Sequence, residues 1–150
     1  MIVADTNTIA YLYINSEKSA QAEQLLMLEP KWIAPSLWKS EFRSVLTLYL
    51  RKNILTFDEI LMINQQAEIQ MLENEYEVSS VHILQLVYSS NCSAYDCEFV
   101  ALAKLLNISL ITADKKIIKA FPDIAQTIDD FVAERCHNWR VNAQAVQVTS

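Results

Sequence analysis

Residues 93–116 read SAYDCEFVALAKLLNISLITADKK, and this stretch holds a helix, a turn and a strand in succession. Ser93 is a favourable helix N-cap because its hydroxyl can accept a hydrogen bond from a free backbone N–H. Apolar residues then recur at helical spacing, at Phe99, Val100, Ala103 and Leu106. Asn107 stands where a left-handed residue commonly closes a helix. The segment 93–107 is therefore predicted to be one capped helix.

The apolar run 108–112 that follows predicts a buried strand, and Asp114 comes directly after it. Residues 115–121 predict a short helix. The start of the chain has the same design, because the apolar residues 2–4 predict a strand and Asp5 follows. Both acids are therefore expected at the carboxyl end of a strand.

The rest of the chain alternates between the same two kinds of element. Helices are predicted over 8–14, 17–28, 36–52 with Ser36 as N-cap, 56–75 with a Thr56–Glu59 capping box, 81–88, and from about 128 to 135. Strands are predicted over 32–34, 77–79 and 125–128. Short apolar strands between helices predict a mostly parallel, roughly five-stranded sheet covered on both faces, a three-layer α/β/α domain. We expect one domain over residues 1–135 and a loose polar tail over 136–150.

The composition excludes several functional classes. The chain has 150 residues, 52% of them hydrophobic, and no glycine. Without glycine it cannot form a G-x-G-x-x-G dinucleotide loop, a P-loop or a G-x-S-x-G nucleophile elbow. The net charge of −6 argues against a protein that holds nucleic acid mainly through a basic surface. It leaves a nuclease possible, since bound cations would offset acids locally.

The sequence predicts a soluble, cytoplasmic protein with no membrane contact. The start, MIVADTN, lacks the basic region of a signal peptide, and the uncharged run 78–95 is too polar for a bilayer core. Three cysteines, at 92, 97 and 136, are an odd number and favour reduced thiols. A metal site built on Cys136 and His137 is the alternative, but its spacing does not resemble a zinc pair.

Asp5 and Asp114 have two available roles. Each could be an N-cap for the helix that follows, which is the common role of aspartate at such a junction. Each also lies at the sheet edge where open α/β sheets bind their ligands. The sequence leaves both roles open.

Glu41 and Asp96 are acids on helix faces that are otherwise apolar. Leu37, Val45 and Leu48 share the stripe with Glu41, and the basic neighbours Lys39 and Arg43 point to other sides of that helix. Asp96 lies on the face of Phe99 and Val100, in the first turn, where the helix dipole stabilises a negative charge. An unpaired carboxylate facing the interior is costly, which favours a functional role for both acids.

The four acids Asp5, Glu41, Asp96 and Asp114 together predict a divalent metal site. Carboxylates that converge repel one another, and Mg²⁺ or Mn²⁺ relieves this repulsion because both ions prefer oxygen ligands. Such a site can activate water and stabilise a leaving oxygen, which is the chemistry of phosphodiester hydrolysis. It needs no histidine base.

Four segments resemble the PIN domain, and the VapC-like ribonuclease toxins most closely. They are Asp5-Thr6-Asn7, Ser40-Glu41-Phe42, Ser93-Ala94-Tyr95-Asp96 and Leu110-Ile111-Thr112-Ala113-Asp114. The resemblance implies that the four acids bind Mg²⁺ or Mn²⁺, that Thr112 orients them, and that Thr6 and Asn7 line the site. It also implies an endoribonuclease of a type II toxin–antitoxin pair, with an RNA substrate, an antitoxin partner and a homodimeric state.

Four further residues near the predicted site are candidates for RNA contact, namely Arg43, Tyr95, Lys115 and Lys116. For the two lysines a solvated helix start is the simpler interpretation. Two other functions remain open. One is a haloacid-dehalogenase-like phosphatase, in which Asp5 would be the nucleophile although Asn7 replaces its second carboxylate. The other is a PIN-fold interaction module without catalysis.

Overall fold

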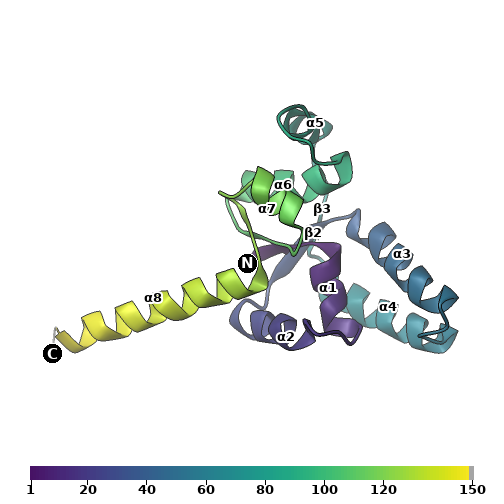
Figure 1. Ribbon diagram of the computed structural model, residues 1–150, viewed down its shortest axis with the longest axis horizontal. Helices are drawn as coiled ribbons and strands as arrows, with labels where there is room; N and C mark the ends of the chain where they lie inside the picture. Colours follow the sequence, from purple (N-terminus) through teal and green to yellow (C-terminus); the bar gives the residue numbers. More distant parts are fainter. Residues whose placement is uncertain (149–150) are drawn as a thin grey trace.

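The computed structural model describes residues 1–148, which form a five-stranded sheet with helices around it (Figure 1). The strands are β1 (Ile2–Ala4), β2 (Trp32–Pro35), β3 (Glu75–Tyr76), β4 (Leu110–Ile111) and β5 (Ala125–Gln126). The helices are α1 (Thr6–Tyr13), α2 (Ser19–Leu28), α3 (Trp38–Arg51), α4 (Phe57–Met71), α5 (Ser80–Tyr88), α6 (Ala94–Leu106), α7 (Lys115–Ala120) and α8 (Ile128–Val148).

All paired strands run parallel, in the order β3-β2-β1-β4-β5. The central strand β1 pairs with β2 through Ile2 and Trp32 and with β4 through Ala4 and Ile111. Every residue of β1, β2 and β4 is buried. This explains their apolar sequences, because a strand covered on both faces has no solvated side. The predicted α/β class and sheet are confirmed.

The helices cover the two faces of the sheet in separate groups. Helix α6 contacts β1, β2 and β4 and packs against α5, whereas α1 contacts α2, α3 and α4. In Figure 1, α5, α6 and α7 lie above the sheet and α1 to α4 lie below it. Strands β2 and β3 follow β1 in the sequence and lie on one side of it in the sheet. The chain then crosses over, and β4 and β5 lie on the other side of β1. The boundary between β1 and β4 is therefore a topological switch point, where α/β sheets open a crevice.

Several predicted boundaries are wrong, for reasons that the structure shows. Helix α3 begins after Leu37 and not at Ser36, because the backbone N–H of Ser36 bonds to Tyr76 O and its hydroxyl donates to Glu77 (2.6 Å). Helix α4 ends at Met71, earlier than predicted, and β3 correspondingly comes earlier than 77–79. The predicted Thr56–Glu59 capping box is confirmed, and so are the Ser93 cap and the left-handed Asn107.

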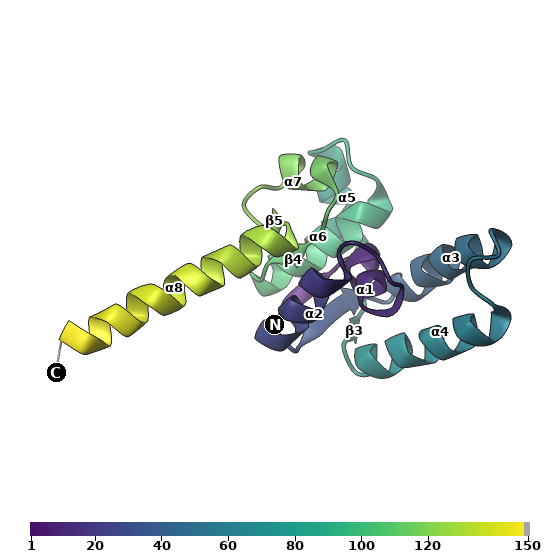
Figure 2. The ribbon, with the colours of Figure 1, turned by 60° about the horizontal axis from the view of Figure 1, so that its bottom comes forward.

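The segment beyond Arg135, for which the sequence predicts a loose tail, has regular secondary structure as far as Val148. Helix α8 continues to Val148 and extends away from the body of the protein (Figure 2). Its sequence contains no proline or glycine, the two residues that most strongly disfavour a helix interior. Glu29, which is buried, anchors the start of the helix by pairing with Arg135. The division of the chain at residue 135 stays a prediction.

No helix within residues 1–148 is both long enough and apolar enough to span a bilayer.

Within residues 1–148, three residues adopt a positive φ although none of them is glycine. They are Asn53, Glu73 and Asn107, and each follows the end of a helix. Asparagine tolerates this region, but glutamate does not, because its Cβ crowds the following carbonyl oxygen. Glu73 has a φ of 66° and is exposed. It lies between the end of α4 and the start of β3.

We therefore expect Glu73→Gly to stabilise the protein, by about 1 kcal/mol, because glycine adopts positive φ without steric conflict. The unfolding temperature should rise by about 2–4 °C in a calorimetric scan. Glu73→Ala is the matched control, because it removes the same carboxylate and keeps the Cβ. Equal stabilities of the two variants would show that the backbone at residue 73 is unstrained.

Candidate active site

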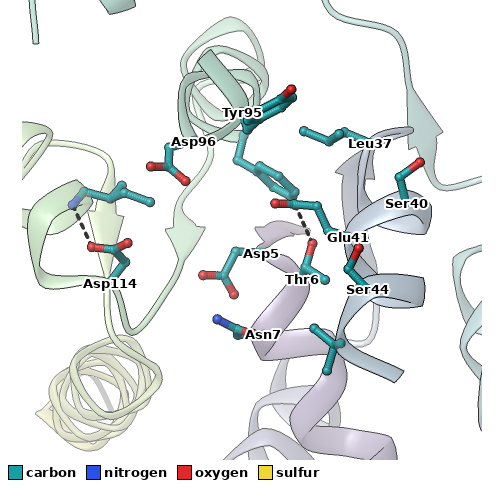
Figure 3. Close-up of a pocket in the computed structure, with 13 residues that line it drawn as sticks. Asp5, Thr6, Asn7, Leu37, Ser40, Glu41, Ser44, Tyr95, Asp96 and Asp114 are labelled. Carbon is teal, nitrogen blue, oxygen red and sulfur yellow. Dashed lines mark hydrogen bonds between the residues drawn. The ribbon is translucent and has the colours of Figure 1, made fainter. Parts of the chain in front are cut away.

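The four predicted acids line one cavity of about 500 Å³ at the carboxyl edge of the sheet (Figure 3). Asp5 follows β1 and Asp114 follows the loop after β4, on either side of the switch point. Glu41 comes from the first turn of α3 and Asp96 from the first turn of α6. The two helices lie on opposite faces of the sheet, so the cavity is enclosed by residues from both halves of the fold.

Asp5 and Asp114 are N-caps as well as cavity residues. Asp5 Oδ1 accepts a hydrogen bond from the backbone N–H of Thr8 (2.8 Å). Asp114 Oδ1 accepts one from the N–H of Lys116 (2.8 Å). Each cap uses one carboxylate oxygen and fixes the side chain at the sheet edge. The two roles that the sequence left open are compatible, since the other oxygen of each acid stays available.

Thr112 lies between these two acids. Its buried hydroxyl oxygen accepts a hydrogen bond from the N–H of Asp114 (3.0 Å), and the same side chain lies close enough to Asp5 to lower the pKa of that acid in part. One threonine therefore holds the ends of the β1 and β4 segments in register.

Glu41 is held from the neighbouring helix. The hydroxyl of Thr6, which is buried, donates to Glu41 Oε1 (2.8 Å) across the cavity, as the dashed line in Figure 3 shows. The basic neighbours of Glu41 are engaged elsewhere: Lys39 pairs with Glu75 (3.1 Å), and Arg43 bonds to Lys39 O and Ser40. An ion pair is therefore not the reason that Glu41 faces inward.

Asp96 is partly buried and faces the cavity from above Asp5 (Figure 3). Its own backbone N–H is capped by the Ser93 hydroxyl (3.1 Å), so the first turn of α6 is fixed. The Asp96 carboxylate makes no ion pair within residues 1–148.

The pKa values of Asp5 and Glu41 are both raised. Burial raises the pKa of Asp5 above its ordinary value of 3.8, hydrogen bonds from Thr112 and Thr8 lower it in part, and repulsion from Asp114 raises it further. Burial likewise raises the pKa of Glu41, the Thr6 hydrogen bond opposes this, and the negative charges of Asp5, Asp96 and Glu98 add to the rise. The cavity is thus a region of uncompensated negative charge.

The donor set fits a hard divalent cation. Carboxylate oxygens are the ligands that Mg²⁺ and Mn²⁺ prefer, and no lysine or arginine within the described chain neutralises the four acids. As they stand, no three His, Cys, Asp or Glu side chains of residues 1–148 are close enough to hold one ion together. Coordination by three of the acids would therefore require them to move closer together.

Other residues complete the wall of the cavity, and some of them have no clear signal in the sequence. Thr6, Asn7 and Tyr95 line it as predicted. Ser44 also lines it, one helical turn after Glu41, and this spacing is the only signal that could have identified it. Arg43 and Lys116 do not line it, and Lys115 lines a neighbouring cavity.

A family model and one curated relative match this chain. The model of the PIN domain matches residues 2–122. Ribonuclease VapC3 of Pyrobaculum aerophilum is 28% identical over 134 residues, which cover 81% of this chain and 95% of the relative.

Two solved structures show the same fold. FitAcB from Neisseria gonorrhoeae has a TM-score of 0.68 at 15% identity, and the match covers 85% of this chain and 98% of that chain. A toxin–antitoxin complex from Klebsiella pneumoniae has a TM-score of 0.64 at 17% identity, with the same two coverages. The family model spans well over half of the sequence, and the fold agrees with it: the chain belongs to the PIN domain family.

Proposed function

We propose that this protein is a metal-dependent endoribonuclease that hydrolyses RNA phosphodiester bonds, and that it is the toxin of a type II toxin–antitoxin pair. One observation carries the proposal. Four acids from four separate segments line one cavity at the switch point, with no basic side chain to neutralise them. Such a charged cluster is costly for a fold to keep unless it binds cations.

Asp5, Glu41, Asp96 and Asp114 would hold Mg²⁺ or Mn²⁺. When bound, a divalent metal supplies an activated water and a counter-charge for the leaving oxygen. The protein supplies orientation: Thr112 and the two caps fix Asp5 and Asp114, and Thr6 fixes Glu41. The exposed ring of Tyr95, at the cavity wall, is available to stack on a base.

The relatives support the nuclease assignment over the alternatives. The Pyrobaculum relative is named a ribonuclease, and one structural neighbour is a toxin–antitoxin complex. A phosphatase of the haloacid-dehalogenase type would use Asp5 as a nucleophile and would give Glu41 no role. A silent interaction module would have no need for four unneutralised acids in one cavity.

Asp5→Asn and Asp96→Asn should each reduce cleavage of a single-stranded RNA pool by at least about 100-fold, equal to about 2.7 kcal/mol of transition-state stabilisation. EDTA should abolish cleavage by the parent protein, and Mg²⁺ or Mn²⁺ should restore it. Initial rates on gels measure both effects.

Glu68→Gln is the matched control, because Glu68 is an exposed helical acid, on α4, that does not line the cavity. It should cleave within a few-fold of the parent. Equal cleavage by all variants, with and without EDTA, would contradict the proposed chemistry.

The acids should also destabilise the metal-free protein at neutral pH. The pKa of Asp5 is raised on folding, so the native state binds protons more tightly than the unfolded state. The free energy of unfolding should therefore fall as the pH rises from the ordinary carboxyl pKa through the raised pKa of Asp5. Asp5→Asn removes the charge and keeps a good N-cap.

In EDTA at neutral pH, Asp5→Asn should unfold at a higher temperature than the parent, and the difference should shrink as the pH approaches the ordinary carboxyl pKa. Adding Mg²⁺ should raise the unfolding temperature of the parent more than that of the variant. Thermal scans across pH measure this without any need for catalysis. If neither Mg²⁺ nor a lower pH changes the unfolding temperature of the parent protein, the cavity binds no cation.

An antitoxin and a second copy of the chain are the partners that we propose. Large apolar side chains are exposed where α3 ends and α4 begins, and exposed apolar clusters commonly mark protein interfaces. They are Leu48, Ile54, Phe57, Leu61 and Met62. The structural neighbours include a toxin–antitoxin complex, which supports a protein partner for this chain.

Expression of the parent protein in a bacterial host should arrest growth, whereas Asp96→Asn should not. Co-expression of a small protein encoded beside this gene should relieve the arrest if it is the antitoxin. Colony counts after induction measure both. Arrest by Asp96→Asn as strong as by the parent would separate toxicity from the acidic cavity and contradict the toxin assignment.

A further inference from the structure

A second cavity of about 200 Å³ lies beside the acidic cavity. Its walls come from the same two segments that carry Asp5 and Asp114, continued by one turn. Thr8 and Tyr11 lie on α1, the helix that Asp5 caps, and Thr112 and Lys115 lie on either side of Asp114 in the sequence. Lys18, at the start of α2, lies on the remaining side. Sequence neighbours on the same two segments therefore line the two cavities.

The second cavity differs from the first in its charge. Two lysines line it, Lys18 and Lys115, and neither makes an ion pair within residues 1–148. One acid, Asp129, lines it too, but it pairs with neither lysine. Lys18 is partly buried and its Nζ lies 5.6 Å from the centre of the Tyr11 ring, a cation–π distance that holds the ammonium in place.

The remaining wall suits a polar ligand. Thr8, Thr112, Thr127 and Tyr11 line it. Burial first, and then the negative charge of Asp5, raises the pKa of Tyr11, whose phenol can donate a hydrogen bond. These are groups that bind phosphate and sugar oxygens.

The overall charge makes these two cations significant. With a net charge of −6 and four acids at the catalytic cavity, the protein repels a polyanion at long range. Bound metal compensates only the phosphate that it contacts. The neighbouring phosphates need their own cations, close to the site.

We propose that the second cavity binds the nucleotide next to the scissile bond, with Lys18 and Lys115 contacting its phosphate, an inference that rests on the proposed function. Lys18 and Lys115 are then substrate-positioning residues, outside the metal chemistry. They set how tightly a polynucleotide is held, and they do not affect a substrate with a single phosphate.

Binding of a fluorescent single-stranded oligoribonucleotide tests this in the Asp96→Asn protein with Mg²⁺, where cleavage is blocked. Lys18→Gln and Lys115→Gln should each raise the Kd roughly fivefold, and each should lower the slope of log Kd against log salt concentration by about 0.7. Lys119→Gln is the matched control, because Lys119 is on α7 and lines neither cavity. It should change the Kd by less than about twofold.

A second measurement separates this subsite from a general charge effect. In the otherwise unmodified enzyme, Lys18→Gln and Lys115→Gln should raise KM for the oligoribonucleotide and leave kcat unchanged. Neither should alter cleavage of a dinucleoside monophosphate, which has only the scissile phosphate. Unchanged far-ultraviolet circular dichroism shows that the variants are folded.

The results distinguish this proposal from the proposed function. Lysine variants that bind like Lys119→Gln overturn the subsite, and so does an Asp96→Asn protein that binds no oligoribonucleotide. If the parent cleaves RNA in either case, the proposed nuclease function still stands. If the parent cleaves no RNA and the lysine variants still bind the oligoribonucleotide more weakly, the proposed nuclease function is wrong and the nucleotide subsite is supported.

Discussion

The parallel pairing of β1 with β4 is the constraint on which the site depends. Val3 pairs with Leu110 and Ala4 with Ile111, so the two strands reach the sheet edge together. Asp5 and Asp114 lie just beyond this edge, and Thr112 joins them. The sheet continues from β1 through β2 and β3 on one side and through β4 and β5 on the other, which makes this edge a topological switch point. Helices α3 and α6 each bring an acid to the cavity there.

The same residues that stabilise the fold therefore define the charge of the cavity. Asp5 and Asp114 satisfy free N–H groups at the starts of α1 and α7, a stabilising role. Burial, and then the nearby charge of Asp114, raise the pKa of Asp5, which is a destabilising effect at neutral pH. Substituting alanine would remove both effects, whereas asparagine keeps the cap, so asparagine variants report on charge alone.

Much of the site follows from local sequence rules. An acid after an apolar strand and an acid in an apolar helical stripe each have a physical signature, and these signatures identify Asp5, Asp114, Glu41 and Asp96. Ser93 and Asn107 are likewise predictable, because caps depend on residues close in sequence. The four acids line one cavity because of tertiary structure, which the sequence indicates only through the alternation of strands and helices.

The errors come from interactions between distant segments. Ser36 has the side chain of an N-cap, but its hydroxyl bonds to Glu77, forty-one residues away. Of the residues that line the second cavity, the sequence singles out Thr112 and Lys115, whereas those of α1, α2 and the start of α8 resemble ordinary helix positions. Lys18 acquires its orientation only from the ring of Tyr11 beside it.

Helix α8 has a consequence for solution measurements. Its 21 residues form a rod about 31 Å long that extends from one side of a compact body. An elongated particle experiences more friction than a sphere of the same mass, so this chain of 17.2 kDa will elute early from a gel-filtration column. The elution volume of a monomer can then resemble that of a larger assembly. Light scattering, which measures mass independently of shape, is the appropriate way to count its subunits.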